Sequence, residues 1–170
     1  MNPDNSQRRP RKFIIGSDHA GRQMKDRIRQ YLIELGHQVE DRTPDQEKTD
    51  YPLVGEDVAR RVARGEGRLG VLVCGTGIGI SIAANKVPGI RAALLYSPEA
   101  ADYARRHNDA NVLVFGGRTM RFPQVRRCID AFLDAEFEGG RHGRRNDHIR
   151  QIEQRSRQGT AREPHSPAER

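Results

Sequence analysis

Five short apolar runs, spread through a chain of 170 residues, constrain the fold more than any other feature of this sequence. The runs are KFIIGS (12–17), HQVED (37–41, the weakest), LGVLVC (69–74), RAALLY (91–96) and NVLVFG (111–116). Between them, apolar residues recur at helical spacing, as at Met24, Ile28, Leu32 and Leu35. Alternating strands and helices predict an α/β fold: a Rossmann-like, five-stranded parallel sheet with helices on both faces, in three α/β/α layers.

Helices are expected between and after these runs. The first follows the opening strand and ends at Gly36, a residue typical of helix C-termini. Ser97, Pro98 and Glu99 supply a cap, a first-turn proline and an acid suited to the start of another helix. The remaining helices are predicted over about 52–64, 80–86, 125–133 and, at the C-terminal end, 146–157; residues 43–52 form a loop.

The length suits one domain, which we place at residues 12–155. A basic tail (1–11) and a polar tail (156–170) are predicted to be disordered. The net charge of +7 comes from the two ends, because residues 1–12 carry +3, residues 141–170 carry +4 and the segment between is neutral. We therefore read the charge as solubilising tails plus a few functional arginines and do not expect nucleic-acid binding.

The expected compartment is the cytoplasm. No apolar run is long enough to cross a membrane, and the polar opening MNPDNSQRRPRK is unlike a secretory signal. Cys74 and Cys128 are the two cysteines, and they are far apart in the sequence, which favours reduced thiols. Cys128 falls on the apolar face of a helix and is predicted to be buried in the core.

The segment CGTGIG (74–79) joins the third strand to a helix. It lacks the lysine of a phosphate-binding P-loop and the acid that accompanies a dinucleotide fingerprint. Its backbone amides and the following helix N-terminus nevertheless favour an anion at this place. A helix N-terminus also favours a thiolate, so Cys74 is either a base for proton transfer or a small buried strand residue.

Other polar residues lie at strand ends. Asp18 and His19 follow the first strand, where Asp18 could equally cap a helix; His107 closes a helix, where its charge could equally complement the helix dipole. The flexible, cationic segment 139–145 holds arginines that suit a phosphate. The histidines show no metal-ligand spacing, and no metal or cofactor is expected. This set suits proton abstraction beside the carbonyl of a phosphorylated sugar, through an enediolate.

Several motifs, in order, closely resemble the ribose-5-phosphate isomerase B family, which includes the galactose-6-phosphate isomerase subunits. They are GSDHAG (16–21), TDYP (49–52), CGTGIGISIAANKVPGIRAAL (74–94), RRHNDANVLVFGGR (105–118) and EGGRHGRR (138–145). The resemblance covers about residues 12–155. It implies an aldose–ketose isomerase of the non-oxidative pentose phosphate pathway that interconverts ribose 5-phosphate and ribulose 5-phosphate without metal or cofactor.

The resemblance also implies roles for particular residues. Cys74 is the base between C2 and C1, and His107, assisted by Thr76, donates the proton that opens the sugar ring. Arg141 and Arg145 hold the phosphate, with His19 nearby. The amides that face the enediolate are those of Gly75, Gly77, Ile78 and Gly79, and the sugar site is lined by Asp18, Tyr51, Asn108 and Arg118. One branch of the family lacks the cysteine and uses as its base a glutamate just after the last glycine of the turn. Ile80 occupies that position here, so Cys74 has to be the base.

By resemblance the protein is a homodimer, often paired into tetramers in the family, with sites shared between subunits. Two alternatives remain at this point. An isomerase of a hexose 6-phosphate, such as galactose or allose 6-phosphate, would use the same residues in a longer pocket. A non-catalytic sugar-phosphate sensor would need the arginines but not Cys74, Thr76 and His107.

Overall fold

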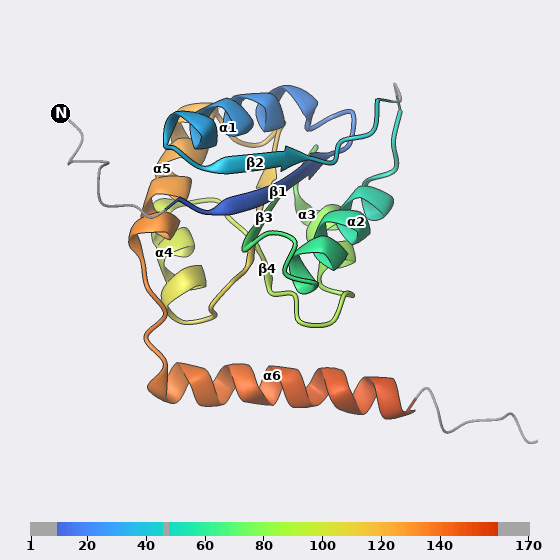
Figure 1. The fold of residues 1–170 in the computed structure, drawn as a ribbon, viewed down its shortest axis with the longest axis vertical. Coiled ribbons are helices and arrows are strands. Elements are labelled where there is room, and N and C mark those ends of the chain that lie inside the picture. The colour runs from blue at the N-terminus through green and yellow to red at the C-terminus, as the bar shows by residue number, and fades with distance from the viewer. Residues whose placement is uncertain (1–9, 46–47, 160–170) are drawn as a thin grey trace, which may run out of the picture.

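The computed structural model describes residues 10–45 and 48–159, and its centre is a parallel sheet (Figure 1). The strands lie in the order β2-β1-β3-β5-β4, and every neighbouring pair is parallel. Their bounds are β1 Lys12–Ser17, β2 Gln38–Asp41, β3 Leu69–Cys74, β4 Ala92–Leu94 and β5 Val112–Gly116. The predicted fold class and all five predicted strands are confirmed, with β4 shorter than the run 91–96.

Five helices cover the two faces of the sheet, and a sixth follows them. They are α1 Arg22–Glu34, α2 Tyr51–Ala63, α3 Ile78–Ala84, α4 Pro98–Arg106, α5 Phe122–Asp134 and α6 Gly140–Gly159. Ser97 caps α4 as predicted, because its Oγ accepts the N–H of Ala100 at 3.1 Å. α1 ends before Gly36, whose positive φ of 81° suits glycine.

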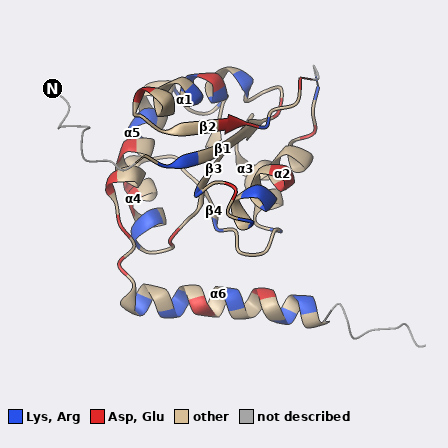
Figure 2. Ribbon diagram, in the orientation of Figure 1, with Lys and Arg blue, Asp and Glu red and all other residues tan. Residues whose placement is uncertain are grey.

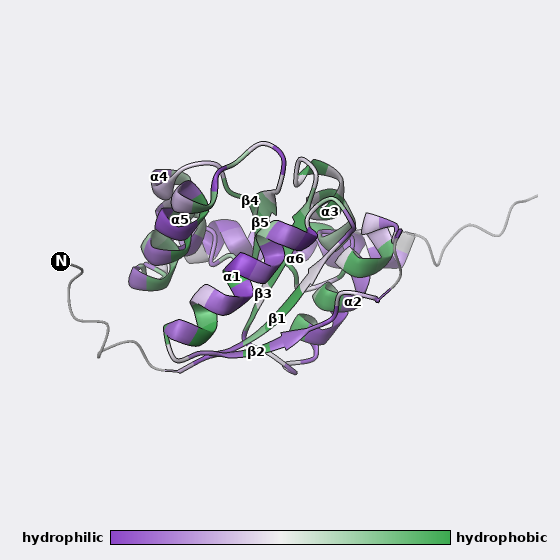
Figure 3. Ribbon diagram, turned by 90° about the horizontal axis from the view of Figure 1, so that it is seen from above, coloured by the Kyte–Doolittle hydropathy of each residue, from purple (hydrophilic) through white to green (hydrophobic). Residues whose placement is uncertain are grey.

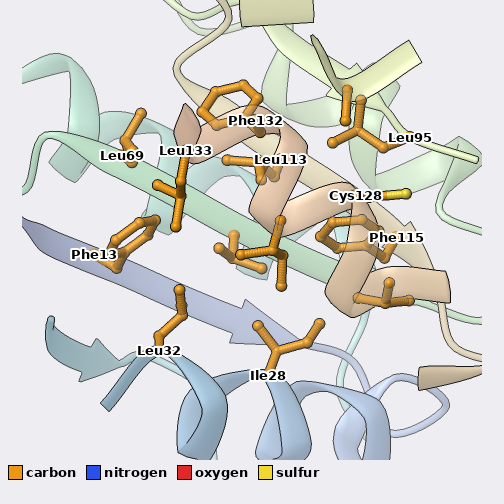
Figure 4. Packing of buried hydrophobic residues seen from close by; sticks show 14 of the residues in the cluster. Phe13, Ile28, Leu32, Leu69, Leu95, Leu113, Phe115, Cys128, Phe132 and Leu133 are labelled. Atoms are coloured by element: carbon orange, nitrogen blue, oxygen red, sulfur yellow. The ribbon is translucent and has the colours of Figure 1, made fainter. Parts of the chain in front are cut away.

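Side-chain alternation along the strands creates two cores, one on each face (Figure 3). Phe13, Phe115 and Phe132 belong to the core under α1, α4 and α5, which Figure 4 shows from close by. Cys128 is fully buried there, as predicted, and burial raises the pKa of its thiol to about 11. Ile14 and Leu72 point the other way and pack against α2 and α3, in the core that also contains Cys74.

The helix α6 differs from the prediction in extent and place. It spans Gly140–Gly159 and includes most of the segment expected to be flexible, 139–145, and the first residues of the predicted C-terminal tail. It runs outside the layered body (Figure 1), where Glu153 Oε1 accepts the N–H of Gly89 at 2.8 Å. The rest of both predicted tails, 1–9 and 160–170, lies outside the described residues.

Within the described part of the chain, no helix combines the length and apolar character needed to cross a membrane.

Candidate active site

The carboxyl ends of β1 and β3 mark the place at which a ligand is expected. From β1 the chain passes to β2 at one side, whereas from β3 it passes to β4 at the far side, so the two strands mark a switch in connection direction. Parallel sheets bind ligands at such points. Asp18 follows β1 and Cys74 ends β3, and the two segments are joined by a bond from the Asp18 N–H to the Val73 carbonyl at 3.3 Å.

Cys74 lies at the start of a tight turn, and one backbone amide of that turn points at its sulfur. The N–H of Gly77 donates to Cys74 Sγ at 3.2 Å, and the side chain is buried. Thr76 is exposed at the tip of the turn, where its Oγ1 accepts the N–H of Ile78 at 3.3 Å. A backbone N–H directed at sulfur stabilises negative charge there, which is what a thiolate base requires.

Two glycines allow this turn to approach its neighbours closely. Gly77 has φ of +80°, and a Cβ at this position would lie 3.0 Å from the carbonyl carbon of Phe115. A Cβ on Gly79 would lie 2.6 Å from the ring of Tyr51, so that ring rests directly against the backbone of α3. Gly77, Gly79 and Tyr51 therefore pack closely around the turn that also contains Gly75 and Ile78.

Asp18, His19 and Arg118 complete this edge. Asp18 is buried, and its Oδ1 accepts the N–H of Gly21 at 2.9 Å. It therefore holds the turn before α1, as expected of the helix-capping role that the sequence also allowed. His19 beside it is exposed. The N–H of Arg118 donates to the Gly75 carbonyl at 2.9 Å, and its guanidinium lies beside the Gly75 backbone.

The other predicted site residues lie at the amino ends of the strands, on the edge of the sheet opposite to Cys74. His107 and Asn108 follow α4, before the amino end of β5, and Arg141 and Arg145 lie in the first turns of α6. Cys74 is paired in register with Gly116, at the carboxyl end of β5. The length of β5, about 13 Å at ~3.3 Å per residue, therefore separates the two groups within one chain.

His107 lies in a stack of three rings. Its ring centroid is 4.8 Å from that of Tyr103 and 4.0 Å from that of His142, whose ring is parallel to it within 2°. Glu138 lies at the edge of the stack, with Oε2 3.8 Å from His107 Nε2 and 3.5 Å from His142 Nε2. Arg106 donates from its Nε to the other oxygen of Glu138 at 2.7 Å.

These surroundings shift two pKa values downward. The hydrogen bond from Arg106 holds the pKa of Glu138 below its usual range, which keeps the carboxylate charged. Burial lowers the pKa of His142, and the nearby charges of His107 and Arg141 lower it further. The sequence alone indicated no role for Tyr103, Glu138 or His142. Glu138 and His142 lie inside the EGGRHGRR motif, which could have marked them as site residues.

His107, Glu138 and His142 place their ligand atoms within 4.8 Å of one another, as a metal-binding group does. The parallel stack of the two histidines opposes such a role, because a metal ion lies in the plane of each imidazole that binds it. One ring would have to turn, and His142 Nε2 already accepts the Nε–H of Arg141 at 3.2 Å. The geometry fits a hydrogen-bonded ring stack better than a metal centre.

Comparison with known proteins agrees with the motifs and the fold. The family model for ribose/galactose isomerases matches residues 13–149. Ribose-5-phosphate isomerase B of Escherichia coli K12 is 47% identical over 146 residues, which are 85% of this chain and 98% of that protein. The chain belongs to the ribose/galactose isomerase family. The family match spans both edges of the sheet and includes every predicted site residue, from Asp18 to Arg145.

Both branches of the family are among the similar proteins. Galactose-6-phosphate isomerase subunit LacB of Clostridium acetobutylicum is 46% identical over 125 residues, covering 73% of this chain and 72% of that protein. Ribose-5-phosphate isomerase B of Clostridium thermocellum superposes with a TM-score of 0.83 at 44% identity, covering 85% of this chain and 99% of that one. Ribose-5-phosphate isomerase B of Mycoplasma genitalium, solved with bound ribulose-5-phosphate, superposes with a TM-score of 0.80 at 40% identity. The match covers 84% of this chain and 96% of that one.

Proposed function

We propose that this member of the ribose/galactose isomerase family interconverts D-ribose 5-phosphate and D-ribulose 5-phosphate in the cytoplasm. The observation that carries the proposal is the Cys74 sulfur, which accepts the Gly77 N–H in the turn at the carboxyl end of β3, beside that of β1. The curated relative that matches over 98% of its own length is named for ribose 5-phosphate. That match favours the pentose over the hexose 6-phosphate.

Cys74 acts as the base in this proposal. Its thiolate removes the proton from C2 of the open-chain aldose and returns a proton to C1, while a proton moves between the oxygens on C1 and C2. Negative charge develops on those oxygens in the enediolate. The amides of residues 75–79 face that charge, and donors fixed in advance are the most effective stabilisers of such an intermediate.

His107 opens the sugar ring in this proposal, and Thr76 assists it. His107 donates a proton to the ring oxygen as the bond from that oxygen to C1 breaks and the C1 hydroxyl loses its proton. Arg141 and Arg145 hold the phosphate: both are exposed in the first turns of α6, a helix rich in basic side chains (Figure 2). Asp18, Tyr51, Asn108 and Arg118 contact the sugar, and His19 lies toward the phosphate.

Two copies of the chain are needed to build one such site. Within one chain Cys74 and His107 lie at opposite edges of the sheet, so we propose a homodimer in which the carboxyl edge of one copy faces α4 and α6 of the other. Ile78 and Ile82 on α3 and Ile149 and Ile152 on α6 are exposed, as side chains buried by a second copy would be. Pairing of dimers into tetramers is a further step of the same proposal.

The proposal is tested by the substrate panel. Purified protein is incubated with ribose 5-phosphate, galactose 6-phosphate and allose 6-phosphate, and ketose formation is followed for each. The expected result is turnover of the pentose phosphate at a kcat/KM at least ten times that of either hexose phosphate. Turnover of a hexose phosphate alone would move the protein to the other branch, and binding without turnover of any of the three would favour a sensor.

A further inference from the structure

We propose that His142 is a positioning residue for His107, fixing the plane of that ring through the parallel stack between them. The inference rests on the proposed function, because it concerns the group that donates the proton in ring opening. It assigns a role to a buried side chain that the reaction itself does not require. The stack, its hydrogen bond to Arg141 and the charge of Glu138 carry it.

His142 is set apart from its neighbours on α6 by burial. Only 5% of His142 is exposed, whereas Arg141, Arg144 and Arg145 around it are exposed. Its N–H donates to the Gly139 carbonyl at 2.9 Å, in the first turn of the helix, and its ring covers one face of His107. Tyr103 covers the other face at 4.8 Å, so rotation of the His107 ring is restricted from both sides.

The hydrogen bond from Arg141 fixes the protonation state of His142. Arg141 Nε is always a donor, so His142 Nε2 has to be an acceptor and the ring is neutral, with its hydrogen on Nδ1. Burial and the nearby positive charges disfavour the imidazolium form in the same direction. A neutral ring can stack on His107 in either charge state of His107 without repulsion between two cations.

Glu138 places a negatively charged carboxylate beside the two stacked histidines. Its Oε2 lies 3.8 Å from His107 Nε2 and 3.5 Å from His142 Nε2, so the carboxylate stands at the edge of both rings. Arg106 holds the carboxylate through Oε1, and the Glu138 N–H donates to the Arg106 carbonyl at 3.0 Å. These two contacts fix the carboxylate beside the stacked rings.

A proton donor has to lie within roughly 2.6–3.2 Å of the atom that it protonates, and a displacement of about 1 Å can cost about 100-fold in rate. Ring opening is needed only for the aldose. Ribulose 5-phosphate is acyclic, because the hydroxyl that would close a five-membered ring carries the phosphate. A positioning role for His142 thus predicts a loss on ribose 5-phosphate that ribulose 5-phosphate does not show.

The test uses two substitutions that separate the ring from its hydrogen bond. His142→Gln removes the ring and keeps an acceptor for Arg141, whereas His142→Phe keeps a ring and removes the acceptor. We expect His142→Gln to lower kcat for ribose 5-phosphate at saturation about 10- to 100-fold, with a parallel fall in KM because the ring form then binds without opening. The kcat for ribulose 5-phosphate should stay within about twofold of the unmodified protein. His142→Phe should recover most of the rate lost on ribose 5-phosphate. His148→Gln, an exposed histidine on the same helix, is the control.

Each outcome bears on a different claim. Equal kcat values of all variants on ribose 5-phosphate, or equal losses of kcat on both substrates, would overturn the positioning role, as would a His142→Phe protein no better than His142→Gln. Thermal unfolding of each variant checks that its fold is retained. An unmodified protein that consumes neither pentose phosphate would instead overturn the proposed function.

Discussion

The backbone N–H of Gly77 donates a hydrogen bond to the sulfur of Cys74 at 3.2 Å, across the turn that joins β3 to α3. Gly77 has a positive φ, and its Cα lies so close to the Phe115 backbone that a Cβ would not fit without a shift. The same residue therefore shapes the turn and directs an amide at the sulfur. This contact links the backbone conformation of the turn to the chemistry proposed for Cys74.

Replacing Cys74 by alanine should reduce turnover of ribose 5-phosphate by at least about 10³-fold, because the variant lacks the base while the amides and arginines remain. Binding of the sugar phosphate, measured by calorimetry, should change little. Cys128→Ala is the matched control, since it removes the other buried thiol, in the core under α5. A Cys74→Ala protein of normal activity would refute the role of the thiol.

Replacing Gly77 by alanine should damage both stability and activity. A side chain is strained at φ of +80°, and its Cβ would lie 3.0 Å from the Phe115 backbone, so we expect a loss of about 1–3 kcal/mol in the free energy of unfolding. Turnover should fall as the amides of the turn move. Urea unfolding and the isomerase assay measure the two effects, with Gly65→Ala, which has a positive φ far from the site, as a control for strain alone.

Arg145→Ala should raise the KM for ribose 5-phosphate by about 10- to 100-fold, the equivalent of one charged hydrogen bond of roughly 1.5–3 kcal/mol. The kcat should change less, because the phosphate is remote from C1 and C2. Arg144→Ala removes an exposed arginine from the adjacent position of α6 and should leave KM unchanged. Equal effects of the two substitutions would indicate general electrostatic attraction in place of a phosphate site.

The lowered pKa of His142 predicts how its contribution to stability depends on pH. In the unfolded chain the histidine takes up a proton near its ordinary pKa of about 6.5, whereas in the folded protein burial, His107, Arg141 and Arg145 oppose protonation, and Glu138 only partly offsets them. Between the two values the unfolded state binds more protons, so the free energy of unfolding falls as the pH is lowered through this window.

Urea unfolding of the unmodified protein and His142→Gln, at about pH 7.5 and about pH 5.5, measures this contribution. The stability advantage of the histidine should be larger at the higher pH. An advantage that grows on acidification would mean that His142 gains a proton on folding, and would contradict the neutral ring inferred from the Arg141 contact.

The sheet was predictable because its strands are apolar runs that end in polar residues. Cys74, Asp18 and His19 became candidates because ligand groups collect at such ends, whereas Arg118 was a candidate only through the family resemblance. α6 was predicted only from residue 146 onward. Glycines at 139, 140 and 143 lower the local helix propensity, so the sequence does not indicate a helix there. The contact that buries His142 against His107 forms only when the chain folds, and a local pattern cannot reveal it. The contact between His107 and His142 joins residues more than 30 positions apart, so no spacing rule could indicate it.

The separation of Cys74 from His107, by contrast, follows from the predicted order of elements, since Cys74 ends a strand and His107 ends a helix. Helices in such folds run antiparallel to the strands, so a residue at the end of α4 falls at the edge opposite to the end of β3. The order of elements thus decides which residues share an edge, and it is the reason for proposing a site built from two copies.

Mixing two inactive variants tests the shared site most directly. Cys74→Ala and His107→Ala subunits are purified separately, mixed under conditions that allow subunit exchange, and assayed with ribose 5-phosphate. Half of the dimers are then mixed and each has one intact site, so activity should return to about a quarter of the unmodified level. If exchange is verified by mass spectrometry and activity does not return, Cys74 and His107 do not act in one site built from two copies.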